Sequence, residues 1–364
     1  MIRLYGPSIG HGSFARCVAG MHKGLVSHSM LAGYVPTDVL YEDESYPGHD
    51  AEVGIYYGPP DRVGIMESIG WHKKRLAMLA PNSTWLPEKL LEHMEKSITG
   101  YIVPSSWARD VLSRYTKLPI YLWRHGVDEG FCTDREDRAA LLRDYDHGRF
   151  VVGHLASSTM QRKGTRELLA AWCGAVSMGL FGRAIPMLKL VVDGPEGFFD
   201  DTIEETSSGN PRIKETIVWS RRRWNMDVGQ AAHFYRKHHL ICQPSRGEGF
   251  GLVPLEARAC GVQVLATDCT GHSEHVRRLR PDGVSISSGS TTISNDDLGP
   301  IDDGPGAVAP GVTAHCIMIG LMCAYSAWPV VARDMEHYAN TVREAWSWKE
   351  VTRLWLDDAR EIFK

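Results

Sequence analysis

Short apolar runs alternate along the chain with segments whose apolar residues recur at helical spacing. The short runs predict strands and the periodic segments predict helices. Strands that alternate with helices are typical of parallel sheets covered by helices on both faces. The predicted strands form two series, residues 2–5, 53–57, 100–103 and 120–123, then 150–155, 188–192, 240–243 and 262–267. The predicted helices cover residues 13–31, 85–97, 107–115, 165–177 and 228–238.

A polar stretch separates the two series of strands. It covers residues 143–149, RDYDHGR, and we interpret it as a hinge. The chain has 364 residues, which is more than one hydrophobic core usually organises. We therefore predict an α/β protein with two doubly wound, Rossmann-like domains that face each other across a cleft. Residues 280–310 are rich in Gly, Asp, Ser and Pro and predict a long loop, after which the tail is predicted to be helical.

Composition narrows the class of protein only slightly. Lys and Arg together number 40 against 44 Asp and Glu, so the net charge of -4 gives no general attraction to nucleic acid. The eight cysteines are scattered singly, which fits a reducing compartment. The first residues, MIRLYGPSIG, lack the pattern of a secretory signal, and the apolar stretch 315–331 is interrupted and predicted to be too short to span a bilayer. We expect a cytoplasmic protein.

The segment with the most chemical information follows the strand predicted to end at residue 243. It reads SRGEGFGLVPLEA and carries Gly247, Gly249 and Gly251. Glycine lets the backbone turn tightly and approach a ligand closely, and Pro254 suits the first turn of a helix. A strand, a glycine-rich turn and a helix N-terminus form an anion site, because the N–H groups and the helix dipole both point at the ligand. We expect a diphosphate there.

Two carboxylates, Glu248 and Glu256, stand at the two ends of this turn. Each could accept hydrogen bonds from vicinal hydroxyls, as on a sugar ring and on a ribose. The residues alone leave a second interpretation open, in which Glu256 complements the helix dipole and Glu248 is an ordinary surface acid.

The spacing Glu248-x7-Glu256 resembles the E-x7-E signature of the family 4 retaining glycosyltransferases. The surrounding residues are similar as well, with Pro244-Ser245 before it and Gly271 with Glu274 after it. The resemblance implies the GT-B architecture, a donor sugar linked to UDP, GDP or ADP, and no metal or other cofactor. It assigns catalysis to Glu248, and donor contacts to Glu248, Gly249, Phe250, Gly251, Leu252 and Glu256.

A second set of similarities concerns the cations that would hold the donor. Lys163, in QRKGTRELL, resembles the family's lysine that contacts the donor diphosphate, so the resemblance gives Lys163 a role in binding and catalysis. Family members usually place an arginine in the preceding strand. Here that position is His154, and we expect His154 or Arg162 to supply the second cation.

The ends of the chain resemble the family too. Gly12 and Ser13 are similar to the N-terminal glycine loop that reaches the donor phosphate, and Glu67, in GIMESIGWHKKR, is implied to face the reacting sugar. The segment SWKEVTRLWL resembles the family's final helix, which crosses back onto the N-terminal domain. The implied division is residues 1–146 on the acceptor side, residues 147–345 on the donor side, and a final helix at 346–364.

The resemblance implies front-face transfer with retention, in which the leaving diphosphate helps to deprotonate the acceptor hydroxyl. Lys163, Arg162 and the N–H groups around residues 250–252 would stabilise the growing charge. The implied acceptor is a carbohydrate or a glycolipid. A hydroxylated nucleobase in DNA stays open as an acceptor, because tryptophans beside the basic residues 72–75 could stack on bases. These tryptophans are Trp71, Trp85, Trp107 and Trp123.

One rival function is an NAD(P)-dependent oxidoreductase. It would use Gly10-x-Gly12-x-x-Ala15 after the first strand, with Asp38 on the ribose. This alternative leaves the E-x7-E segment unexplained.

Two further rivals concern metal and catalysis. A metal-dependent transferase would need an Asp-x-Asp motif, but Asp144-Tyr145-Asp146 follows a helical run and we interpret it as a polar linker. His272 and His275 have no further ligands near them in the sequence, so no metal site is expected there. A non-catalytic nucleotide-sugar-binding relative would share the fold, and only turnover would exclude it.

Overall fold

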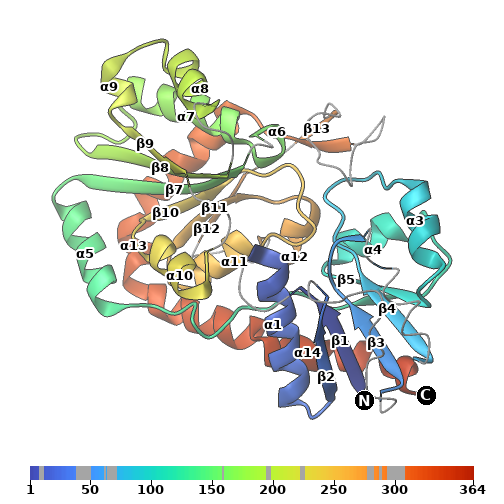
Figure 1. Cartoon of the computed structure of the whole chain (residues 1–364). Coiled ribbons are helices and arrows are strands. Elements are labelled where there is room, and N and C mark those ends of the chain that lie inside the picture. The colour runs from blue at the N-terminus through green and yellow to red at the C-terminus, as the bar shows by residue number, and fades with distance from the viewer. Residues whose placement is uncertain are drawn as a thin grey trace.

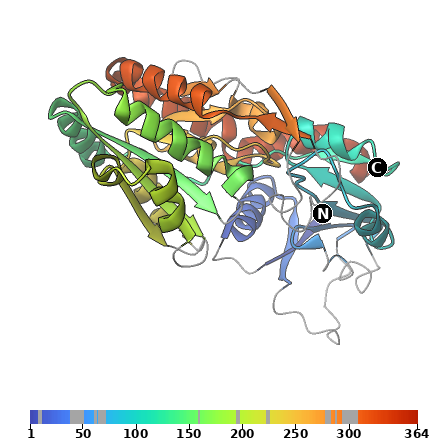
Figure 2. The same ribbon diagram turned by 90° about the horizontal axis from the view of Figure 1, so that it is seen from above.

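The computed structural model describes residues 1–7, 12–37, 51–60, 63, 72–157, 160–193, 198–221, 226–276, 283–286, 289–292 and 308–364. Within them the chain forms two parallel sheets that lie side by side, with helices packed around each (Figure 1). Seen from above, helix α1 lies between the two halves (Figure 2). The predicted α/β class with two doubly wound halves is confirmed.

The first sheet has the strand order β2-β1-β3-β4-β5-β6 and is parallel throughout. Its strands are β1 (Ile2–Gly6), β2 (Leu31–Pro36), β3 (Val53–Tyr56), β4 (Lys74–Met78), β5 (Gly100–Val103) and β6 (Ile120–Leu122). Its described helices are α1 (Gly12–Ser27), α3 (Glu88–Glu95) and α4 (Ser106–Leu112). The sequence pattern predicted neither β2 nor β4. The first is mostly half-buried and follows α1 after three residues, and the second begins with two basic residues, so neither reads as a buried apolar run.

The second sheet has the order β12-β11-β10-β7-β8-β9 and is also parallel. Its strands are β7 (Arg149–Ser157), β8 (Ile185–Asp193), β9 (Ile217–Arg221), β10 (Leu240–Gln243), β11 (Gln263–Thr267) and β12 (Gly283–Ile286). Its main helices are α5 (Arg135–Asp146), α7 (Thr165–Ser177), α8 (Phe198–Ser207), α10 (Val228–Arg236), α11 (Leu252–Ala259) and α13 (Ala314–Trp346). Shorter elements are α6 (Met160–Lys163), α9 (Pro211–Lys214), α12 (Ser273–Val276) and the hairpin β13 (Gly289–Thr292) and β14 (Val308–Gly311). The order reverses at β10 and β7, and open α/β sheets bind ligands at such a reversal.

The predicted hinge at residues 143–149 is wrong for most of its length. Residues 143–146 belong to helix α5, which ends at Asp146. Its first turn is capped by Asp134, which accepts from two backbone N–H groups. The chain instead crosses between the sheets in the segment before α5. There the N–H of Val127 donates to the carbonyl of Trp346 at 2.8 Å, so the outgoing and the returning crossings lie against each other.

Helix α13 is longer than the sequence pattern predicted. It runs for 33 residues straight through Pro329, and by length and composition alone it could cross a membrane. In this structure it covers one edge of the second sheet and packs against α7 and α11 (Figure 1). Buried Leu321 and Trp328 belong to the core of this half, and 33% of the most apolar window is buried. The expectation that this stretch is too short therefore fails, because a proline in mid-helix did not end it.

Helix α14 (Trp348–Asp358) returns to the first half and packs against α1. Trp355 stacks on Trp123 with ring centroids 4.1 Å apart and an interplanar angle of 8°. On the facing helix, a Cβ on Gly20 would lie 1.9 Å from the Trp348 ring. The close packing of α1 against α14 therefore depends on the missing side chain at position 20.

We predict that Gly20→Ala lowers the free energy of unfolding by about 1–3 kcal/mol, because the added methyl group overlaps the Trp348 indole. Gly174→Ala is the matched control, since a Cβ at that helical position meets only the sulfur of Met318 at 3.4 Å. It should be neutral or gain up to about 1 kcal/mol from the better helix former. Urea unfolding followed by circular dichroism measures both, and equal stability of the two variants would contradict the packing described.

Candidate functional site

A cavity of about 390 Å³ lies between the two halves. It is bounded by residues 248–253 after β10, by α1 and α6, and by residues that follow β3, β4 and β6. Each of those strands contributes at its carboxyl end, where ligands bind in open parallel sheets. The charged groups among the lining residues are Arg16, Arg162, Lys163 and Glu248.

The glycines of the loop after β10 are explained by contact with the first half of the chain. A Cβ on Gly247 would lie 2.1 Å from the carbonyl oxygen of Asn82, and one on Gly249 would lie 2.7 Å from the Cβ of Ala80. From the sequence we expected these glycines to let the backbone approach a ligand closely. In the structure they also let the loop approach residues 80–82 of the first half closely.

The N-terminus of α11 faces the cavity. Gly251 adopts a left-handed conformation with φ +87° and gives the helix no side-chain cap. Leu252 and Val253, the first two helical residues, line the cavity. The first N–H groups of a helix have no partner within the helix, so this end presents the predicted anion-binding arrangement.

Glu248 is held by two cations. Its Oε1 lies 2.5 Å from Lys163 Nζ and 3.3 Å from Arg162 Nη1, and it accepts from the Ser245 hydroxyl at 2.9 Å. Burial by itself raises the pKa of Glu248, but Lys163, Arg162 and His272 lower it to about 2. Burial lowers the pKa of Lys163, and Glu248 opposes that shift. The residues predicted to surround the donor therefore do meet, as two cations that share one carboxylate.

His154 does not supply a cation, contrary to the expectation. Its side chain is fully buried, with Nδ1 2.8 Å from the Cys242 carbonyl and Nε2 2.9 Å from the Thr165 hydroxyl. Burial lowers the pKa of His154 to about 4, so the imidazole is neutral. It joins β7, β10 and α7 in the core of the second half. Arg162 is the one of the two candidates that reaches the cavity.

Glu256 is buried more deeply than Glu248, with 2% of its surface exposed. Tyr235 donates its hydroxyl to Oε2 at 2.7 Å, and Arg16 Nη2 lies 3.2 Å from Oε1. Glu256 lines a second cavity of about 410 Å³, which Arg16 shares with the first. Glu256 thus faces the second cavity, whereas Glu248 faces the first. Glu256 lies about one turn into α11, and Glu248 lies in the loop before it.

Gly12 and Ser13 begin α1, at the start of a helix as predicted. Phe250 lines the first cavity and is buried against His125, with ring centroids 5.2 Å apart. Glu67, Gly10, Trp71 and Asp38 lie outside the described residues.

The tryptophans and basic residues do not form a stacking surface in the described part of the chain. Trp123 is fully buried and Trp107 packs against the core of the first half. His72 is buried beside Tyr5, with its Nε2 2.8 Å from the Tyr5 hydroxyl. Arg75 donates to the Ser97 carbonyl at 2.7 Å. These contacts give His72 and Arg75 a structural role, while Lys73 and Lys74 are exposed.

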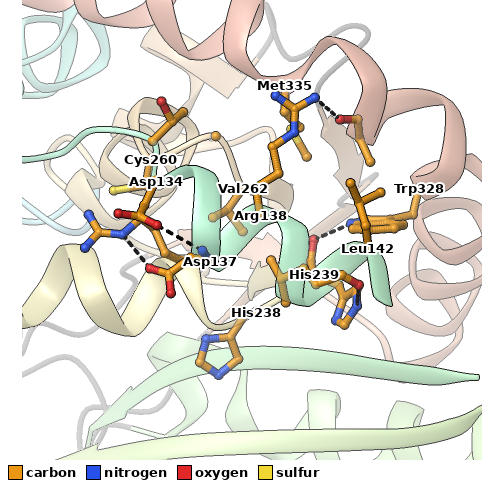
Figure 3. A pocket seen from close by; sticks show the side chains of 15 residues that line it. Asp134, Asp137, Arg138, Leu142, His238, His239, Cys260, Val262, Trp328 and Met335 are labelled. Carbon is orange, nitrogen blue, oxygen red and sulfur yellow. Dashed lines mark hydrogen bonds and ion pairs between the residues drawn. The ribbon is translucent and has the colours of Figure 1, made fainter. Parts of the chain in front are cut away.

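The Asp-x-Asp alternative also fails on geometry. Asp144 and Asp146 lie in α5, not at the end of a strand, and Tyr145 stacks on Trp328 with ring centroids 4.8 Å apart. A small hollow of about 30 Å³ lies between α5 and α13 (Figure 3). It has room for little more than ordered water. Among the described residues, no three His, Cys, Asp or Glu side chains are arranged to hold a metal ion.

Contacts that close the cleft were not predicted from the sequence. Asn82 accepts from the N–H of Gly249 at 3.1 Å, and Ser105 donates to the Gly249 carbonyl at 2.7 Å. Glu274 accepts from Arg124 Nε at 2.8 Å. Glu274 was quoted as part of the motif, but its partner lies 150 residues away. A single sequence carries no signal for such a pairing.

The protein-family comparison matches residues 149–292 to the model of glycosyl transferases group 1. A D-inositol 3-phosphate glycosyltransferase of Rhodococcus erythropolis is 32% identical over 148 residues, which cover 40% of this chain and 31% of the relative. The lipopolysaccharide core biosynthesis mannosyltransferase LpsB of Rhizobium meliloti is 56% identical over 43 residues, 12% of each chain. The chain therefore spans less than a third of the length of either relative.

Solved structures resemble the whole chain. Anabaena Alr3699/HepE in complex with UDP and glucose has a TM-score of 0.64 at 14% identity, covering 98% of both chains. Sucrose-phosphate synthase from Thermosynechococcus elongatus has a TM-score of 0.66 at 14% identity, covering 100% of this chain and 98% of the other. At this identity the likeness concerns the fold, and it confirms the predicted architecture of two facing Rossmann-like halves.

The ion pair at Glu248 makes a stability prediction. The pKa of Glu248 lies near 2 in the folded protein, against an ordinary value of 4.5. Its stabilising contribution is therefore complete above about pH 4.5 and is lost as the pH falls toward 2. Glu248→Gln should be less stable than the wild type at pH 7, and the gap should narrow at pH 3 by on the order of 2 kcal/mol.

Urea unfolding at pH 7, 5, 4 and 3 measures this gap. The control is Glu52→Gln, which breaks an exposed pair with Lys73 and should cost little at any of these pH values. A stability difference between Glu248→Gln and the wild type that stays constant with pH would show that the neighbours do not lower the pKa of Glu248.

Proposed function

We propose that this chain, a GT-B protein whose residues 149–292 match the glycosyl transferases group 1, transfers a sugar from a nucleotide donor to an acceptor hydroxyl with retention of configuration. The observation that carries the proposal is the meeting of Lys163 and Arg162 at Glu248, beside the uncapped N-terminus of α11. Two cations that share one carboxylate leave a surplus positive charge in the cavity. A donor diphosphate would be balanced by that surplus and by the helix N–H groups.

We propose that the donor lies along α11. Its diphosphate would contact Lys163, Arg162 and the N–H groups of residues 250–252, its sugar would face Glu248, and its ribose would reach Glu256. Gly12 and Ser13 at the start of α1 would approach the phosphates from the opposite half. No metal is proposed, because Lys163 and Arg162 can supply the positive charge themselves.

The ionisable groups of the cavity support a mechanism without a protein base. Burial lowers the pKa of His125 to about 3, and the pKa of Glu248 lies near 2. Burial raises the pKa of Cys17 to about 12. A general base works best when its pKa lies near the operating pH, and none of these three does. The leaving diphosphate is then the base we propose for the acceptor hydroxyl.

UDP-linked sugars are the donors to test first, because the Anabaena Alr3699/HepE structures contain UDP and UDP-glucose. The acceptor we propose is a carbohydrate or a glycolipid hydroxyl. DNA with a hydroxylated base is not favoured, because Trp123 and His72, two of the residues that suggested it, are buried in the protein. The eight cysteines form no disulfide, which supports a cytoplasmic location.

Donor binding can be tested with a thermal-shift panel of UDP-, GDP-, ADP- and dTDP-sugars. A ligand at about 100 times its Kd stabilises the folded state by about 2.7 kcal/mol. We expect one clear responder, and slow release of free nucleotide in a mass-spectrometric assay. A shift with NAD(P) and with no nucleotide sugar would overturn the proposed function in favour of the oxidoreductase.

Lys163→Ala and Glu256→Ala should each lower the rate of nucleotide release by about 10²–10³, because each removes one stabiliser of the bound donor. Lys214→Ala is the control, since Lys214 pairs with Glu204 on the surface of α9, outside the cavity. It should keep the wild-type rate. Folding of all three is checked by circular dichroism, and near wild-type turnover in Lys163→Ala would remove the site assignment.

A further inference from the structure

Arg16 is a residue of the first half that pairs with Glu256 of the second half and lines both cavities. It lies in α1, which stands between the two halves (Figure 2). Its Nη2 lies 3.2 Å from Glu256 Oε1, and its Cζ lies 5.9 Å from the centroid of the Phe131 ring. Only 19% of its side chain is exposed. No sequence motif marks this arginine.

The pairing with Arg16 stabilises the buried, charged carboxylate of Glu256. Its side chain is 3% exposed, and an isolated buried carboxylate is costly unless it is paired and hydrogen-bonded. Tyr235 supplies one hydrogen bond to Oε2, and Arg16 is the cation within ion-pair distance among the described residues. Burial and Glu256 raise the pKa of Tyr235, so the phenol keeps its proton and donates.

The pair does not occupy all of Glu256. A carboxylate has about four acceptor positions on its two oxygens. Tyr235 takes one on Oε2 and Arg16 takes one on Oε1. One position on each oxygen is left, which matches the two vicinal hydroxyls of a ribose. Nε of Arg16 is also buried and has no partner among the described residues.

We propose that Arg16 is a positioning residue for the nucleoside half of the donor, acting through Glu256. It keeps the carboxylate ionised and directed at the ribose hydroxyls, and it ties ribose recognition to the contact between α1 and α11. The inference rests on the proposed function, since it requires a nucleotide in the cleft. It goes beyond that function by making recognition of the ribose, and not only of the phosphates, depend on a residue of the acceptor half.

The test compares ligands with and without a ribose. Calorimetric titration measures the Kd of a nucleoside diphosphate, the one whose sugar gives the largest thermal shift, and of inorganic pyrophosphate. Arg16→Met keeps the length and apolar stem of the side chain but removes the charge. It should raise the Kd of the nucleoside diphosphate by about tenfold or more and change the Kd of pyrophosphate by less than about twofold.

Two further variants separate positioning from folding. Arg16→Lys restores a cation near Glu256 and should recover part of the lost affinity, although its geometry is poorer. Arg353→Met is the matched control, because it removes an arginine charge that pairs with Glu350 and Asp357 on α14, outside both cavities. It should bind both ligands as the wild type does. In a Glu256→Gln background, Arg16→Met should add little further loss, since the two residues act as one unit.

Each other outcome has a definite meaning. Equal loss of pyrophosphate and nucleoside diphosphate in Arg16→Met would overturn the inference, because Arg16 would then act on the phosphates or on the fold. Unchanged or tighter nucleotide binding would overturn it as well. Tighter binding would mean that the Arg16 side chain blocks the nucleotide site in the wild type. If the wild type bound pyrophosphate but no nucleoside diphosphate, the proposed function itself would fail.

Discussion

The contact between the glycine loop after β10 and the segment 80–82 governs the arrangement of the whole molecule. The loop lies so close that a single Cβ at Gly247 or Gly249 would overlap Asn82 or Ala80. This closeness brings the end of β4 and the start of α11 to one cavity. It also fixes Glu248 at the boundary between the halves, where burial strengthens its attraction to Lys163. Charge, cavity and domain contact therefore depend on the same few backbone atoms.

The charges of the cleft divide into two groups with different tasks. Glu248 shares its Oε1 between two cations of its own half. Glu256, in the first turns of α11, takes its cation from the other half. The ion pairs of Glu248 are therefore internal to the second half, whereas that of Glu256 joins the two halves.

The sequence predicted local features well and long-range features poorly. The glycine-rich turn and its helix follow from spacing within one short segment. The placing of Lys163 and Glu248 at one site came only from the resemblance, because 85 residues separate them. His154 was misjudged because the family position suggested a cation, whereas the pattern could not show that α7 covers that face of β7. The half-buried strand β2 gave no apolar run to detect.

Arg16 was missed for a more general reason. A lone arginine in an amphipathic helix resembles any solvated residue, and only the fold reveals that Glu256 faces it. The glycines also serve a contact between the halves that was not predicted, because a sequence cannot show which backbone segments approach each other. The roles proposed for Glu67 and for the loop at Gly12 stay predictions.

The two crossings of the chain, joined by the hydrogen bond from Val127 to Trp346, bear on how the cleft can open. Two connections at separated points would allow the halves to twist and slide independently. Here both connections run through one place, and α14 continues from it to lie along α1. Such an attachment favours rotation of the two halves about a single axis through this point. Rotation about that axis would separate Arg16 from Glu256, because the two residues belong to opposite halves.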